Sequence, residues 1–113
     1  MGIIDVAELK RRLDGDEDIV RELFQIFLEE IPRMAGDIRA AVAAADAERL
    51  MRAAHALKGS AANIAAERVA AIAGNLEAMG RACDLGGMEA VHGELEAEIE
   101  QLKTFLASEA LAA

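Results

Sequence analysis

The feature that most constrains the fold is a long helical pattern in the first half of the chain. Apolar residues recur along about residues 17–45 with a period close to 3.6, the spacing that lines one face of an α-helix. Pro32 falls inside this run, and a proline in a helix interior costs about 3 kcal/mol. Because the apolar stripe keeps its phase across Pro32, the pattern predicts one kinked helix rather than two separate helices.

Four further helices are predicted around this long one. Two of the breaks between helices are rich in Asp and Gly, namely DGDED at residues 14–18 and DLGG at residues 84–87. The predicted ranges of the four helices are about 5–13, 46–63, 66–83 and 88–106. Asp46 is the expected N-cap of the helix that begins there, and the tail, residues 108–113, is expected to fray.

Length and composition favour a single all-α domain that spans residues 1–113, since the chain has one proline and few β-branched residues. Long amphipathic helices with short loops pack as an antiparallel bundle in a chain of this size. We therefore expect a four-helix bundle, with the short additional N-terminal helix capping one end. Such a bundle can bury its own apolar stripes, so a monomer is expected. The residues expected to point inward from the helix at 66–83 are Val69, Ile72, Leu76, Met79 and Cys83.

The charge balance argues against several classes of partner. Lys and Arg number 12 and Asp and Glu 21, for a formal charge of −9, which would repel a phosphate backbone, so no nucleic acid is expected. The longest stretches without charge are about half of what a membrane span needs, so no membrane association is expected. The N-terminus is charged and unlike a signal peptide, and Cys83 is a single cysteine. Both observations favour a reducing, cytoplasmic location.

One segment, AAHALKGSAANIAA at residues 53–66, departs from this acidic character. Projected as a helix, it continues a core face made by Leu50, Leu57 and Ile64. His55 lies on the opposite side and should be exposed at the middle of a rigid element. Its neighbours on that side are Met51, Arg52, Lys58, Gly59 and Ala62.

The surroundings of His55 suggest a site for an anion. Residues 49–66 contain no Asp or Glu but three basic residues, which is a positive patch on an acidic chain. Gly59 lies one turn after His55, where it costs about 1 kcal/mol relative to Ala. Its bare backbone would let another surface approach the imidazole.

These residue types fit phosphoryl transfer. A neutral imidazole is a good nucleophile, and Lys58, three residues after His55, can place its ammonium near a phosphoryl group on the ring. The reaction asks a protein mainly for positioning and charge stabilisation. His55, Lys58 and Gly59 therefore suffice if a partner brings a metal and an acid. Taken alone, each of the three residues would be an ordinary solvated or helix-end residue, and only their combination favours this interpretation.

The segment HALKGSAANIAA, residues 55–66, resembles the signature of histidine-containing phosphotransfer (HPt) domains, in which the histidine is followed by an apolar residue and then by Lys-Gly-Ser or Lys-Gly-Ala. The segment FLEEIPRM, residues 27–34, resembles the family's preceding helix, which also carries a proline near its middle. The resemblance covers about residues 3–107. The chain departs from it at Ala65, where many members have glycine, and this difference bears on the turn that follows the site.

The resemblance implies a four-helix bundle in which His55 is phosphorylated by the aspartyl phosphate of a response-regulator receiver domain and passes the group to another receiver. It implies that Lys58 stabilises the phosphoryl group and that Gly59 gives steric clearance. Mg²⁺ is then expected on the receiver, with no cofactor and no metal on this chain. A hybrid histidine kinase is a further candidate partner. The residues expected to contact the receiver are Met51, Arg52, Ala62 and Asn63.

Two alternatives stay open at this point. The chain could be the phosphoacceptor domain of a larger hybrid or chemotaxis-type histidine kinase, or a helical adaptor that docks a receiver without chemistry. No Gly-rich phosphate loop is present, so a phosphoryl carrier without autokinase activity is expected, and its status as an enzyme is left open. Glu89 and His92 form one Glu-x-x-His motif, whereas di-metal bundles use two such motifs and two further glutamates. His92 is therefore expected to be structural or solvated.

Overall fold

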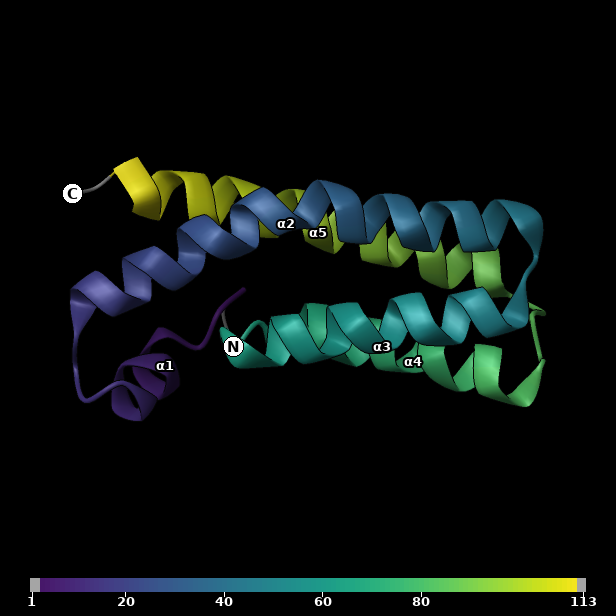
Figure 1. Cartoon of the computed structure of the whole chain (residues 1–113), viewed down its shortest axis with the longest axis horizontal. Coiled ribbons are helices and arrows are strands. Elements are labelled where there is room, and N and C mark those ends of the chain that lie inside the picture. The colour runs from purple at the N-terminus through teal and green to yellow at the C-terminus, as the bar shows by residue number, and fades with distance from the viewer. Residues whose placement is uncertain (1–2, 112–113) are drawn as a thin grey trace.

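The structure is a computed structural model that describes residues 3–111, and these residues form five α-helices (Figure 1). The helices are α1 (Val6–Arg12), α2 (Glu17–Ala44), α3 (Ala47–Asn63), α4 (Glu67–Ala82) and α5 (Met88–Leu111). None of the described helices is long and apolar enough to cross a membrane.

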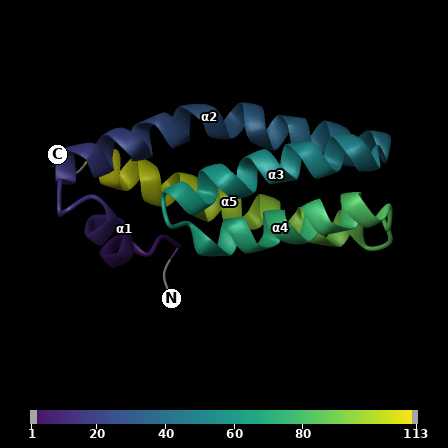
Figure 2. The same ribbon diagram turned by 60° about the horizontal axis from the view of Figure 1, so that its bottom comes forward.

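Helices α2 to α5 form an antiparallel four-helix bundle (Figures 1 and 2). Together with α1 the molecule measures 42 × 22 × 20 Å. Helix α3 packs against α2 and α4, and α5 packs against the same two helices. The short α1 lies across one end of the bundle. The predicted fold class is confirmed, because buried apolar residues from all the described helices form one hydrophobic core.

Helix α2 is continuous through Pro32, as the phase of its apolar stripe predicted. Ile31 and Met34 on either side of the proline are buried, while Pro32 itself is exposed. Figure 1 shows the helix changing direction near its middle, which is the usual result of a proline inside a helix. The kink therefore leaves the packing of the stripe intact.

The turn between α2 and α3 sets where the site helix begins. Ala45 closes α2 in the left-handed conformation, with φ of 51°. Asp46 then caps α3 as predicted, because its carboxylate accepts a hydrogen bond from the backbone N–H of Arg49 at 3.1 Å. The cap supplies one of the partners that the first turn of a helix lacks.

The turn between α3 and α4 is held by the N-terminal segment. The backbone N–H of Asp5 donates to the carbonyl of Ala65 at 3.0 Å, and the guanidinium of Arg12 donates to the carbonyl of Ala62 at 2.9 Å. Ala65 is buried and has a φ of 58°, a conformation that glycine adopts with less strain. The turn is thus formed with alanine in place of the glycine expected from the resemblance.

The structure differs from the predicted elements in three details. Helix α5 continues to Leu111, beyond the predicted range 88–106. Fraying of the tail, residues 108–113, stays a prediction, and residues 112–113 lie outside the described part. Cys83 is exposed at the left-handed C-cap of α4 instead of pointing inward. Ile19, an apolar residue within the predicted run at 17–45, is 41% exposed, whereas the next residue, Val20, is buried.

Candidate functional site

His55 lies in the middle of α3, on the side away from the buried Leu50 and Leu57. Its side chain is 68% exposed, as the helical projection predicted. Helix α3 packs against both α2 and α4. The imidazole therefore projects from a helix that is packed on two sides, and it is accessible from solvent.

Glu77 of α4 is the residue that sequence reasoning missed. It is buried, at 3% exposure, and its Oε2 lies 2.7 Å from Nδ1 of His55. Its Oε1 lies 2.5 Å from Nζ of Lys58, and the guanidinium of Arg81 lies 3.1 Å from Oε2. One carboxylate thus joins a histidine, a lysine and an arginine from two helices.

The surroundings of His55 are therefore not free of acidic residues, although the sequence segment around it is. Residues 49–66 carry no acid, yet α4 supplies one directly beneath the histidine. A signal was available, because Glu77 interrupts the apolar face of α4. The buried neighbours that define this face are Val69, Ala73, Leu76 and Gly80. An acid in such a stripe needs partners, because a buried charge without them is costly.

The contact with Glu77 determines which nitrogen of His55 can react. An ionised carboxylate only accepts hydrogen bonds, so neutral His55 carries its proton on Nδ1 and donates it to Glu77. The lone pair then lies on Nε2, which has no hydrogen-bond partner among the residues that the structure describes. In this tautomer the nucleophilic nitrogen of the exposed imidazole is Nε2.

The hydrogen bond from Lys58 is the main cause that lowers the pKa of Glu77, to about 2. Burial acts in the opposite direction, and the hydrogen bond from His55 lowers the pKa further. Glu77 is therefore ionised throughout the physiological range, as its role of hydrogen-bond acceptor from His55 requires.

Gly80 of α4 allows this close meeting of α3 and α4. A Cβ on Gly80 would lie 2.6 Å from the carbonyl oxygen of Ala47 and 2.8 Å from the backbone nitrogen of Met51. The helices can approach this closely only because the side chain is absent. The aliphatic stem of Lys58 passes Gly74, with its Cδ 3.5 Å from a Cβ placed there.

The residues predicted from the sequence share the face around His55. Met51, Arg52, His55, Glu77 and Arg81 line an open pocket of about 270 Å³. Gly59, Ala62 and Asn63 are exposed farther along α3, and nothing lies within 4 Å of a Cβ built on Gly59. Next to them is a groove of about 190 Å³ between α2 and α3, lined by Leu23, Ile26, Phe27, Glu30, Ser60, Asn63 and Ile64.

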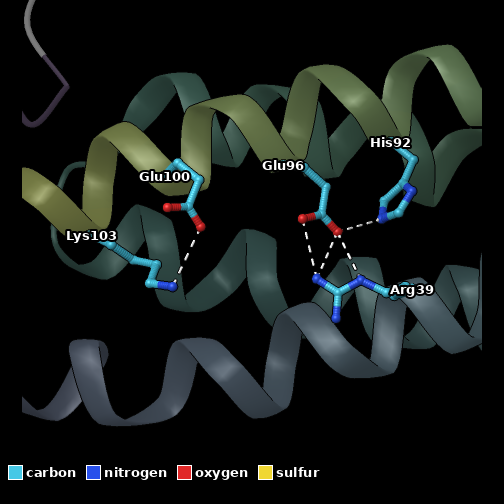
Figure 3. Close-up of polar contacts among 5 residues, drawn as sticks. All are labelled: Arg39, His92, Glu96, Glu100 and Lys103. Atoms are coloured by element: carbon cyan, nitrogen blue, oxygen red, sulfur yellow. Dashed lines mark hydrogen bonds and ion pairs between the residues drawn. The ribbon is translucent and has the colours of Figure 1, made fainter.

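His92 of α5 points toward Glu96 and Arg39, as Figure 3 shows. Its Nε2 is 3.0 Å from Oε1 of Glu96, and Arg39 of α2 pairs with the same carboxylate at 2.9 Å. This cluster ties α5 to α2. Within the described residues, no group of three or more His, Cys, Asp and Glu side chains could hold a metal ion.

The fold and this face define a class of protein: a helical bundle that presents one oriented histidine to a docking partner. The comparisons with known proteins agree, because the family model of the Hpt domain matches residues 22–105. The chain belongs to the Hpt domain family, and its function is histidine phosphotransfer within a phosphorelay. Domains of this family interact with response-regulator receiver domains.

A solved structure shows the same fold. The crystal structure of histidine-containing phosphotransfer protein B (HptB) from Pseudomonas aeruginosa PAO1 matches with a TM-score of 0.89 and 24% sequence identity, over 98% of this chain and 96% of that chain. The match includes α1, which precedes the residues covered by the family model. No curated protein sequence matches this chain.

Proposed function

We propose that His55 is the phosphoacceptor of this domain and that Nε2 is the reacting atom. The observation that carries the proposal is the contact of Nδ1 with the buried Glu77 at 2.7 Å, because it leaves the Nε2 lone pair toward solvent. In the transfer step the lone pair forms the N–P bond while the O–P bond of the aspartyl phosphate breaks. The aspartate of the receiver leaves as a carboxylate, and the proton on Nδ1 stays in its hydrogen bond.

Charge stabilisation comes from the side chains beside the ring. Lys58, one turn from His55, can turn its ammonium toward the transferring phosphoryl group, and Arg81 offers a second cation from α4. Such preorganised donors act where charge develops in the transition state. Mg²⁺ belongs to the receiver in this proposal, and this chain contributes no cofactor.

The receiver docks over the exposed face of α3. Gly59 gives the clearance that its partner needs, since the space above it is open. Met51 and Arg52 on one side of His55, and Ala62 and Asn63 on the other, make the contacts. The adjacent groove carries Ile26, which is 50% exposed, and offers an apolar extension of the surface. The same proposal takes the domain as a monomer in the cytoplasm, since its helices bury their own stripes and it has a single cysteine.

The test is phosphorylation of the domain by a phosphorylated receiver domain in the presence of Mg²⁺. The wild type is compared with His55→Gln and with His92→Gln as the matched control, and the product is followed by intact mass. The wild type and His92→Gln should each gain one acid-labile, alkali-stable phosphoryl group, and His55→Gln should gain none. Label on His55→Gln would mean that another residue is the phosphoacceptor and would defeat the proposal. An unlabelled wild type that still binds several receivers would also defeat it and would favour an adaptor.

A further inference from the structure

The site contains one anion surrounded by three groups that could each serve a phosphoryl group. Glu77 contacts His55, Lys58 and Arg81 through its two oxygens at 2.5–3.1 Å. The carboxylate side chain is 4% exposed, whereas the side chains of His55 and Arg81 are 68% and 67% exposed. The anion therefore holds its partners from below, while their tips reach the solvent.

Phosphorylation changes the charge balance of this cluster. A phosphoryl group brings roughly −1.5 to −2 charges at neutral pH, and on Nε2 it would stand beside Lys58 and Arg81. Both cations are already paired with Glu77. The phosphoryl group and Glu77 must therefore compete for the same two cations, and the like charges repel each other.

The hydrogen bond between Glu77 and Nδ1 of His55 also makes the phosphorylated ring more reactive. Once Nε2 carries the phosphoryl group and Nδ1 keeps its proton, the ring is positively charged. A carboxylate that accepts a hydrogen bond from Nδ1–H favours this charged form. When the N–P bond breaks, the ring is the leaving group. A positively charged ring is the better leaving group, because it becomes neutral when it takes the electron pair of the bond.

We propose that Glu77 keeps the phosphohistidine reactive, by competing with the phosphoryl group for Lys58 and Arg81 and so favouring onward transfer over storage. This inference rests on the function proposed above. In the onward step the N–P bond breaks with its electron pair returning to Nε2, and an O–P bond forms to a receiver aspartate. Nothing is oxidised or reduced, and the proton on Nδ1 remains with the ring.

The test uses Glu77→Gln. The amide oxygen of the glutamine can still accept a hydrogen bond from Nδ1–H, but the negative charge of the carboxylate is removed. Glu96→Gln is the matched control, because Glu96 also contacts a histidine and an arginine. The proteins are phosphorylated with phosphoramidate, a small donor that needs no docking. The lifetime of the label at neutral pH is then measured, and so is the equilibrium with a receiver domain that accepts phosphate from the wild type.

We expect Glu77→Gln to hold the label longer and to shift the equilibrium toward the phosphorylated domain, by roughly fivefold to tenfold. Glu96→Gln should behave as the wild type. The gain from Glu77→Gln should be smaller in the Lys58→Met background than in the wild type, since competition for the lysine is absent there and only competition for Arg81 remains. An unchanged equilibrium in a folded Glu77→Gln would mean that Glu77 only orients the ring, and a shorter lifetime would mean that it holds Lys58 in place for the phosphoryl group.

Failure of the inference and failure of the proposed function give different results. A wild type that phosphoramidate cannot label on His55 would overturn the proposed function before Glu77 is in question. A wild type labelled on His55, with equal lifetimes in Glu77→Gln and Glu96→Gln, would overturn the inference alone.

Discussion

Two histidines of this domain each contact a glutamate, and their surroundings are opposite. At the α3–α4 face the histidine side chain is 68% exposed and Glu77 is 4% exposed. At the α2–α5 face the His92 side chain is 17% exposed and Glu96 is 35% exposed. His55 uses Nδ1 for its contact, whereas His92 uses Nε2.

The difference explains why we propose His55, and not His92, as the reacting histidine. Contact with a carboxylate is common to both residues and therefore does not distinguish them. Glu77 is buried and contacts Nδ1 of His55, so Nε2 of His55 has no hydrogen-bond partner among the described residues. The carboxylate of Glu96, which contacts His92, also binds Arg39 (Figure 3). These three residues link α5 to α2.

The largest expected effect concerns Lys58, with Lys103 of α5 as its matched control. Lys58 and Lys103 are each paired with a glutamate, and both side chains are 41% exposed. Lys58→Met should slow phosphoryl transfer from a phosphorylated receiver by about 10²-fold, because a preorganised charge beside the transferring group is lost. Lys103→Met should leave the initial rate unchanged. Equal rates in the two variants would remove Lys58 from the mechanism.

The next effect concerns the packing that brings Glu77 to His55. Gly80→Ala should lower the free energy of unfolding by about 1–3 kcal/mol, the usual cost of overpacking, because its Cβ would meet the backbone of Ala47 and Met51. Urea denaturation measures this change.

Gly93 beside His92 is the matched control for Gly80, since nothing lies within 4 Å of a Cβ built there. Gly93→Ala should raise the free energy of unfolding by about 0.5–1 kcal/mol through helix propensity. A stabilised Gly80→Ala variant would show that the close approach of α3 and α4 is not needed.

A smaller effect is expected at Gly59, which like Gly93 has open space above it. Gly59→Ala should also gain about 0.5–1 kcal/mol in the free energy of unfolding. Its transfer rate with a receiver should nevertheless fall by about tenfold, because misplacement of the reacting groups is costly. Labelling by phosphoramidate should fall much less. If receiver transfer is unaffected, the clearance proposed for Gly59 is wrong.

Most of the bundle could be predicted from the sequence because its evidence is local. The α2 stripe across Pro32 and the Asp46 cap depend on residues a few positions apart, and so does the exposure of His55. Glu77 could not be placed in this way, because its partners His55 and Lys58 come from another helix. An acidic residue on an apolar helix face was a visible anomaly in the sequence. Only the packing of α3 against α4 shows which side chains form hydrogen bonds and ion pairs with it.

The smallest expected effect is a pH dependence that arises from Glu77. Its pKa is lowered from the usual 4.5 to about 2 in the folded protein, so the unfolded chain binds a proton first as the pH falls. The stability that this group contributes is present above about pH 4.5 and is lost as the pH falls toward 2. In urea denaturation across this window, the wild type should lose stability more steeply than Glu77→Gln. Parallel curves would mean that Lys58 does not hold the carboxylate as the geometry indicates.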